Sequence, residues 1–112
     1  MKGTIKDRQV FSRAYKKGRK YVGRYSVLYV LTGYEGGGNL YGLTVTKKRG
    51  GAVERNRIKR VLRAAYRQND PLISGGHFIV IAGRDASKYA KSTAVARDMK
   101  RGFDELGLTV AS

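Results

Sequence analysis

The segment between Gly50 and Arg67 places two kinds of side chain at helical spacing. Apolar residues recur every three or four positions, at Ile58, Val61, Leu62, Ala65 and Tyr66. This period is typical of a helix that packs one stripe against a core. Cationic and amide residues occupy the other side, at Arg55, Asn56, Lys59, Arg60, Arg63 and Arg67. Like charges at this spacing repel one another, so a face without interleaved acids indicates anion binding, with a solvated basic face as the alternative.

The start of this helix carries its own signals. Gly50 and Gly51 permit a sharp turn into the helix, since glycine adopts backbone conformations closed to other residues. Glu54 puts a negative charge in the first turn, where the helix dipole favours it. Lys47 and Lys48 precede the glycines and extend the positive charge.

The sequence shows no set of side chains capable of independent catalysis. A nuclease needs carboxylates gathered around a divalent metal, or an acid/base pair built on histidine. The eight acids are scattered along the chain, and His77, the single histidine, is expected to be structural. Without cysteine, neither a disulfide nor an ordinary structural zinc site is expected. We therefore predict no catalytic residue in the protein and assign no metal ligand.

Composition indicates a polyanionic partner. Lysine and arginine together number 24 against 8 acids, and the resulting net charge of +16 opposes compaction. The longest purely apolar runs fall far short of the ~20 residues that span a bilayer, and the charged N-terminus does not resemble a signal peptide. We expect residues 1–112 to form a single nucleic-acid-binding domain in the cytoplasm, without membrane association.

Aromatic side chains add a second chemistry suited to nucleic acid. Phe11 and Tyr15 lie four apart in a helix predicted over 5–17, with Asp7 as its N-cap and Gly18 beyond its end. Such rings stack on unpaired bases, although two core anchors are the commoner interpretation of this spacing. A helix-turn-helix protein would place another helix and a short turn before the recognition helix. Here a strand and a glycine loop precede it, so RNA is favoured and no DNA partner is expected.

Two strands are predicted before the basic helix. The β-branched and aromatic segments 25–32 and 40–46 are expected to form a hairpin around a glycine-rich loop, and the basic segment 18–24 is expected to be a linker. Residues 40–46 form one strand or divide into two. The triple glycine at 36–38 lacks the lysine, the hydroxyl residue and the helix of a phosphate-binding loop, so a turn is predicted.

One strand and one helix are predicted after the basic helix. Residues 77–82 are a continuous apolar run, as in a buried strand, and complete a βαβ unit. A stripe from Val95 to Leu106 predicts a last helix with Ser92 or Thr93 as its cap. The predicted order is α-β-β-(β)-α-β-α.

Four segments resemble the bacterial ribonuclease P protein component. TVTKKRGGAVERNRIKRVLRAAYR, with Arg55, Asn56 and Arg57 at its centre, is similar to the signature helix of that family. DRQVFSRAYKKGRK resembles its first helix, YSVLYVL its first strand and FIVIAGRDASK its last strand and the following loop. The resemblance covers nearly the whole chain, with departures at Gly51 and Glu54.

This resemblance implies a fold and a function. The fold would be an α/β (α+β) two-layer sandwich like the second domain of some ribosomal proteins, with a left-handed crossover, whereas the general rule predicts a right-handed one. The protein would be the accessory subunit of a ribonucleoprotein endonuclease, a hydrolase that removes the 5′ leader from precursor tRNA. The catalytic RNA would carry the chemistry, and Mg²⁺ would be bound mainly by that RNA and the substrate.

The resemblance also implies two RNA-binding surfaces. The 5′-leader cleft would be formed by Phe11, Tyr15, Tyr29, Lys47 and Lys48. The catalytic RNA would contact Arg55, Asn56, Arg57, Lys59, Arg60, Arg63 and Arg67. The alternative is a structural, ribosomal-protein-like RNA-binding protein of similar fold, which needs no open aromatic cleft. Burial of all three rings would therefore favour the alternative, and leader cleavage by the protein alone would indicate an independent enzyme.

Overall fold

The computed structural model describes residues 4–5 and 7–110. Its helices and strands run in the order α1 (Arg8–Lys17), β1 (Arg19–Val22), β2 (Ser26–Thr32), β3 (Leu40–Thr44), α2 (Ala52–Asn69), β4 (His77–Gly83) and α3 (Ser92–Glu105). Short 3-10 turns lie between them at η1 (Lys47–Arg49), η2 (Asp70–Leu72) and η3 (Asp85–Ser87). No helix in these ranges is long and apolar enough to cross a membrane.

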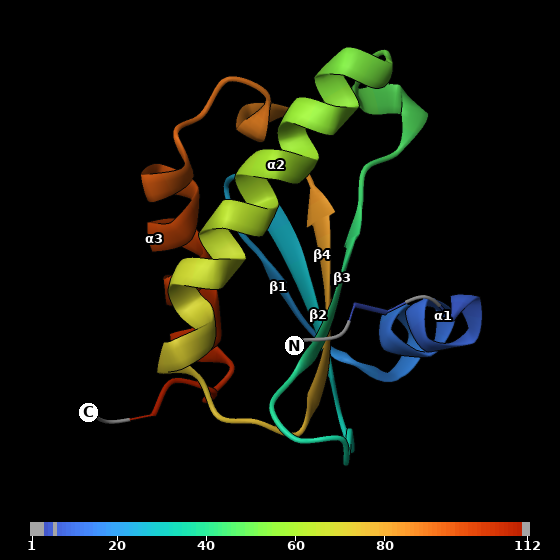
Figure 1. Cartoon of the computed structure of the whole chain (residues 1–112), viewed down its shortest axis with the longest axis vertical. Helices are drawn as coiled ribbons and strands as arrows, with labels where there is room; N and C mark the ends of the chain where they lie inside the picture. Colours follow the sequence, from blue (N-terminus) through green and yellow to red (C-terminus); the bar gives the residue numbers. More distant parts are fainter. Residues whose placement is uncertain (1–3, 6, 111–112) are drawn as a thin grey trace.

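The strands form one mixed sheet in the order β1-β2-β4-β3 (Figure 1). β4 pairs antiparallel with β2 along its whole length and parallel with β3 on its other side. The helices α2 and α3 cover one face of the sheet, and α1 lies against the other. This arrangement confirms the predicted α/β sandwich and adds that the second face is partly covered.

The predicted hairpin between residues 25–32 and 40–46 is wrong, because β4 lies between β2 and β3. β2 instead forms a hairpin with β1, in the segment that was predicted to be a linker. The fourth strand thus comes from residues 19–22, and not from a division of residues 40–46. β1 is an edge strand with exposed Arg19 and Lys20. Such charges are common on edge strands because they discourage further pairing. Here they made the segment resemble a basic linker, so the strand was not predicted.

The glycine-rich loop after β2 passes around the start of β4 and does not turn back on β2. Gly33 donates a backbone hydrogen bond to the Gly76 carbonyl (2.9 Å), and Gly76 donates to the Gly38 carbonyl (2.8 Å). The side chain of Asn39 accepts a hydrogen bond from the His77 backbone (3.0 Å). These contacts hold the loop away from the edge of β2, so that β4 pairs with β2 there.

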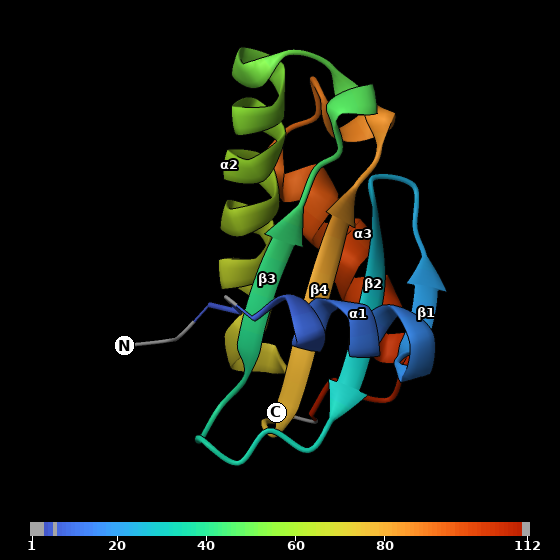
Figure 2. The same cartoon turned by 90° about the vertical axis from the view of Figure 1, so that its right-hand side faces the viewer.

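The βαβ unit predicted around the basic helix is present, as β3, α2 and β4. In Figure 2, β3 and β4 both point upward with β4 on the right, and α2 lies behind the sheet. This is a left-handed crossover, the hand of only about 2% of such connections. It agrees with the hand implied by the family resemblance.

The core on the α2 side contains the apolar stripe predicted from the sequence. Ile58 and Leu62 of α2 are fully buried and belong to one cluster with Phe103 of α3 and with Leu28 and Ile81 of the sheet. A smaller cluster on the α1 face is built on Ile5, Ala14 and Val80. The two clusters fix α2 and α1 on opposite faces of the sheet.

Two of the predicted local features are confirmed and one is wrong. The Asp7 carboxylate caps α1 by accepting a hydrogen bond from the Gln9 backbone (2.8 Å). His77 is buried, with Thr32 and Ser74 hydroxyls 3.2 Å from its two ring nitrogens, as expected of a structural histidine. Neither Ser92 nor Thr93 caps α3, because the N-cap position is Lys91 and no side chain makes the cap bond.

Candidate nucleic-acid interface

An aromatic cleft lies between α1 and the open face of the sheet. Its walls enclose about 410 Å³ and are formed by Arg8, Phe11, Ser12, Tyr15, Leu43 and Thr44. The Tyr15 side chain is 43% exposed and meets Tyr29 of β2 edge to face, with 4.7 Å between ring centroids. Phe11 and Tyr29 are half-buried. Phe11 and Tyr15 line the cleft, whereas Tyr29 adjoins it through its contact with Tyr15. None of the three rings is fully buried, although Phe11 and Tyr29 also pack against the cluster under α1.

Gly42 of β3 sets how closely α1 approaches the sheet. A Cβ atom at this position would lie 2.6 Å from Cζ of Phe11 and 3.1 Å from Cβ of Ile5. Real Cβ contacts are longer, so with any other residue at this position the Phe11 ring would have to shift away from the strand. The glycine therefore allows Phe11 to rest on the strand while its outer side lines the cleft.

A cation that the sequence did not indicate lies beside Tyr29, on the sheet face that α1 covers. Lys20 of β1 places its Nζ atom 5.8 Å from the centroid of the Tyr29 ring, within the range of a cation–π interaction. It was missed because residues 18–24 were predicted to be a linker. Burial raises the pKa of the Tyr15 phenol, partly offset by a hydrogen bond with Thr44, so the ring stays neutral at physiological pH.

Lys47 and Lys48, predicted for the same cleft, lie in η1 just beyond the end of β3. Both are exposed, and neither belongs to the residues that line the cleft. They lie three and four residues after Thr44, which does line it. The structure thus places them past one end of the cleft and not in its walls.

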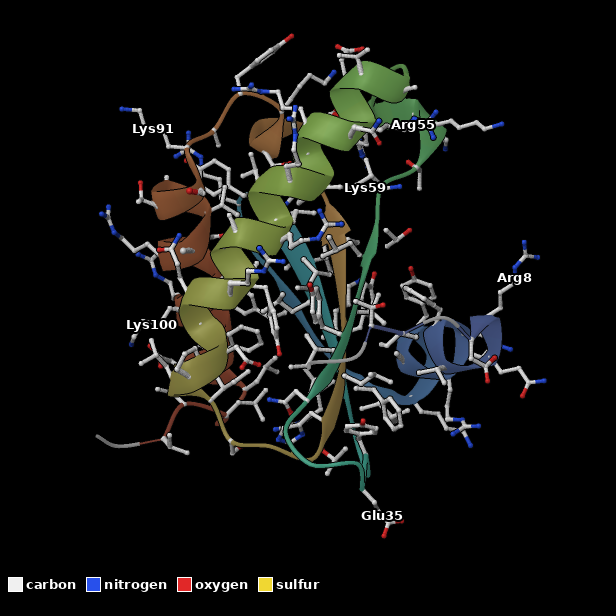
Figure 3. The ribbon with its side chains drawn as sticks, in the orientation of Figure 1. Arg8, Glu35, Arg55, Lys59, Lys91 and Lys100 are labelled. Carbon is white, nitrogen blue, oxygen red and sulfur yellow. The ribbon has the colours of Figure 1, made fainter. Side chains whose placement is uncertain are left out.

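The basic face of α2 is open to solvent. Asn56, Arg57, Arg60 and Arg67 are exposed, while Arg55, Lys59 and Arg63 are half-buried. A shallow depression of about 460 Å³ runs along it between Val53, Asn56, Lys59, Arg60 and Arg63. Figure 3 shows Arg55 and Lys59 on the side of the helix that faces β3. β3 is an edge strand, so the basic face and the aromatic cleft adjoin the same sheet edge.

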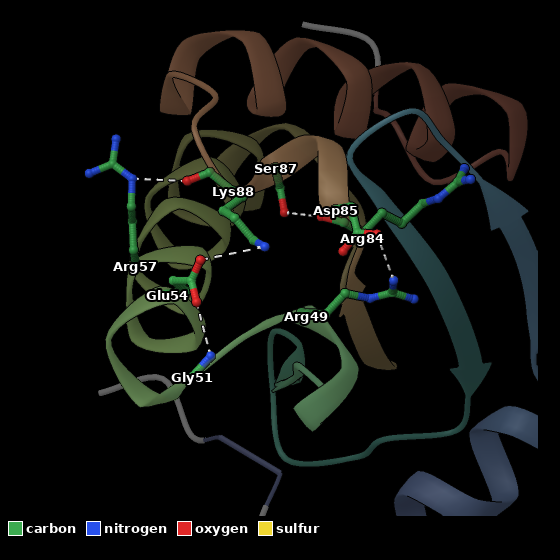
Figure 4. Close-up of polar contacts among 8 residues, drawn as sticks. All are labelled: Arg49, Gly51, Glu54, Arg57, Arg84, Asp85, Ser87 and Lys88. Atoms are coloured by element: carbon green, nitrogen blue, oxygen red, sulfur yellow. Dashed lines mark hydrogen bonds and ion pairs between the residues drawn. The ribbon is translucent and has the colours of Figure 1, made fainter.

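Arg57 stands apart from the other basic residues of α2. Its Nε atom donates a hydrogen bond to the Lys88 carbonyl (2.9 Å), and the rest of its guanidinium points away from the protein (Figure 4). The resemblance grouped it with Arg55 and Asn56, but the structure directs it toward the segment before α3. Sequence spacing alone offered no signal for this contact, because the two residues are 31 positions apart.

Glu54, one of the departures from the family, ties the start of α2 to that same segment. Its carboxylate accepts a hydrogen bond from the Gly51 backbone (3.0 Å) and lies 3.6 Å from Nζ of Lys88 (Figure 4). The Gly51 hydrogen bond and the Lys88 charge together hold the pKa of Glu54 below its usual value. Arg49 and Asp85 form a second ion pair nearby, at 3.1 Å.

Comparison with known proteins decides the family. From residue 2 to residue 107 the chain matches the family model described as ribonuclease P. The chain belongs to the ribonuclease P family. A ribonuclease P protein component of Clostridium acetobutylicum is 34% identical over 107 residues, covering 95% of this chain and 90% of the relative. That of Lachnoclostridium phytofermentans is 40% identical over 88 residues, covering 79% and 75%.

Solved structures of ribonuclease P proteins share the fold. The protein from Staphylococcus aureus aligns with a TM-score of 0.82 at 26% identity, covering 98% of this chain and all of the other. A mutant of the S. aureus protein, described as defective in mRNA degradation activity, aligns with a TM-score of 0.80 at 28% identity, covering 94% and 88%. The Thermotoga maritima protein aligns with a TM-score of 0.75 at 24% identity, covering 89% and 94%, and supports the fold alone.

Replacing Arg60 or Arg63 of this ribonuclease P family member by alanine is expected to weaken RNA binding and to lower its salt dependence. Each lost phosphate contact should reduce the slope of log K against log salt by about one unit. Titrations at several salt concentrations measure the slope. Lys100→Ala is the matched control, because Lys100 already pairs with Asp104 at 3.2 Å on α3. Unchanged slopes in both α2 variants would contradict a phosphate role.

Proposed function

We propose that this chain is the protein component of ribonuclease P, the endonuclease complex that removes the 5′ leader from precursor tRNA. The cationic face of α2 binds the catalytic RNA, and the aromatic cleft holds the single-stranded leader. The observation that carries this assignment is the cleft that Phe11 and Tyr15 line together with Leu43 and Thr44 of β3, the edge strand that α2 also borders. Tyr29 of β2 adjoins this cleft through its ring contact with Tyr15. A purely structural RNA-binding protein would have no need of this cleft, so its openness supports the leader role.

The two surfaces suit two different parts of an RNA. Guanidinium and ammonium groups neutralise phosphates and release counterions, which gives affinity without sequence preference. Aromatic rings stack on unpaired bases, and a leader is single-stranded whereas mature tRNA is folded. We infer that residues 1–112 act as one RNA-binding domain in the cytoplasm, holding the leader close to the catalytic RNA.

We assign the chemistry of cleavage to the partner RNA. In the part of the chain that the structure describes, no three His, Cys, Asp or Glu side chains lie close enough together to hold a metal ion. These residues therefore do not fit a protein-bound metal centre. Mg²⁺ in the complex would be bound mainly by the RNA and the substrate, and the protein would contribute binding and orientation.

Reconstitution tests this function directly. The protein is mixed with a bacterial ribonuclease P RNA at a magnesium concentration too low for the RNA alone, and cleavage of precursor tRNA is followed on a gel. We expect the protein to restore removal of the 5′ leader. No restoration, although the protein is folded, would contradict the assignment.

The same assay without the catalytic RNA tests the remaining hypothesis, that the protein is an independent RNA-cleaving enzyme. Protein alone is incubated with magnesium and either precursor tRNA or an mRNA, because an mRNA-degrading activity is attributed to the S. aureus protein. We expect no cleavage of either substrate. Leader removal in the absence of RNA would replace the assignment with an independent RNA-cleaving enzyme.

A further inference from the structure

A second cleft lies between α2 and the segment that leads from η3 into α3. It encloses about 650 Å³. Arg57, Arg60, Val61 and Ala64 line it from α2, and Tyr89 and Lys91 line it from the opposite side. It lies on the helical face of the sheet, whereas the aromatic cleft lies on the α1 face.

Tyr89 presents its ring to solvent at the wall of this second cleft. The side chain is 76% exposed, the most exposed tyrosine or phenylalanine in the described part of the chain. It takes part in none of the ring–ring pairs found there. Exposing so large an apolar surface is unfavourable in water, so an available ring beside cations suits a stacking partner.

The charges around the ring are positive and are not neutralised from within. Glu54 is the single acid on α2, and Asp85 is the single acid in segment 84–91. Glu54 is engaged by Lys88 and Asp85 by Arg49. The first turn of α3 contains no acid. Arg57, Arg60 and Lys91 are therefore left to face an external anion.

The cleft is already formed in the free protein, because its two walls are joined. The backbone carbonyl of Lys88 accepts from Nε of Arg57 (2.9 Å), and the Lys88 ammonium pairs with Glu54 (Figure 4). The Ser87 hydroxyl donates to the Arg84 carbonyl (2.6 Å), which holds the turn itself. Tyr89 follows Lys88 directly, so its backbone is fixed relative to α2. Pre-organisation of this kind lowers the entropic cost of binding.

We infer that this cleft binds one unpaired nucleotide of the partner RNA, with the base stacked on Tyr89 and its phosphates held by Arg57, Arg60 and Lys91. A paired base has no free face for the ring, so the ligand must be a single-stranded or bulged position. This inference rests on the proposed function for the identity of the RNA. It adds a base-stacking site to a helix otherwise expected to contact phosphates, and it gives Glu54 a positioning role.

A fluorescent reporter at the ring tests the site without the catalytic RNA. The chain contains no tryptophan, so Tyr89→Trp introduces a single reporter, and Val110→Trp is the matched control at an exposed position near the C-terminus. The Val110 backbone donates a hydrogen bond to the Leu72 carbonyl of η2 (2.9 Å), beyond the C-terminal end of α2, whereas Arg57 of the second cleft lies near the start of that helix. The probes are a single-stranded hexauridylate and a blunt RNA duplex.

We expect hexauridylate to quench the reporter at position 89 and leave that at position 110 unchanged. The duplex should bind without quenching. Equal quenching at both positions, quenching by the duplex, or no quenching with hexauridylate would each overturn the inference. Displacement of hexauridylate by hexaglutamate at equal concentration would also overturn it, because the cleft would then suit an acidic protein.

Affinity for a bacterial ribonuclease P RNA provides the second measurement. Tyr89→Ala is expected to weaken binding about tenfold, within the range of a lost stacking contact, and Tyr89→Phe should restore it. The salt slope should be unchanged, since no phosphate contact is removed. A Tyr89→Ala protein that binds like the wild type would overturn the inference alone, whereas failure of the wild type to restore precursor tRNA cleavage would overturn the proposed function.

Discussion

Removing both rings of the aromatic cleft, with Phe11→Ala and Tyr15→Ala together, is expected to weaken binding of precursor tRNA on the order of a hundredfold, because each lost stacking contact costs about 1–3 kcal/mol. Mature tRNA lacks the leader and should bind nearly as it does to the wild type. The measurement is a pair of titrations of the protein–RNA complex with the two tRNAs. The ratio of the affinities for precursor and mature tRNA, and not either affinity alone, measures the contribution of the cleft to leader binding.

The control for this variant keeps the ring and removes a polar atom. Tyr15→Phe loses the hydroxyl that hydrogen-bonds with Thr44 but retains the stacking surface, so it should remain selective for the precursor. Phe11 also packs against the cluster under α1, and its loss could disturb the helix. Equal losses of affinity for both tRNAs would indicate such a disturbance and contradict leader stacking.

The basic helix and the first helix could be predicted because their signals are local. The apolar stripe of α2 repeats within a few residues, and Ile58, Leu62 and Ala65 are all buried where the period placed them. Asp7 caps α1 from within the same turn. A signal contained in four or five neighbouring residues survives without knowledge of the rest of the chain.

The strand pairing could not be predicted, because it depends on contacts distant in sequence. β2 pairs with β4, where Leu28 lies opposite Ile81. The residues next to Leu28 or Ile81 in the sequence carry no signal that predicts this pairing. β1 was concealed by the charges of Arg19 and Lys20. The left-handed crossover followed from the family resemblance alone, since general chirality favours the opposite hand.

The residues of the candidate sites also fall into those with a local sequence signal and those whose role depends on contacts distant in sequence. Arg60 and Arg63 were predicted from their spacing on one helix. Tyr89 could not be predicted as a site residue, because its place beside the basic helix depends on the hydrogen bond from Arg57 to the Lys88 carbonyl, and these two residues are 31 positions apart. Glu54 looked like a local departure from the family, yet its partner Lys88 lies on the other wall of the second cleft. Such residues acquire a role only when the fold brings two segments together.

Gly42→Val is expected to impair the aromatic cleft and to leave the basic face of α2 intact, because the new side chain meets α1 and not α2. The added side chain would meet Phe11 at a point where even a Cβ atom lies only 2.6 Å away. Overpacking of this kind costs about 1–3 kcal/mol of unfolding free energy. We expect α1 to move outward, selectivity for precursor tRNA to fall more than tenfold, and affinity for the catalytic RNA alone to stay unchanged. Urea denaturation and the two RNA titrations measure these effects.

A double-mutant cycle identifies the contact responsible. Phe11→Ala removes the atoms that the new side chain would strike, so adding it to Gly42→Val should recover part of the lost stability. The two changes should therefore be non-additive by more than the ~0.5 kcal/mol seen for independent sites. Selectivity for precursor tRNA should not recover, because the stacking ring is absent. Strict additivity in the unfolding free energies would show that Gly42 does not hold α1 through Phe11, and the cleft would need another explanation for its shape.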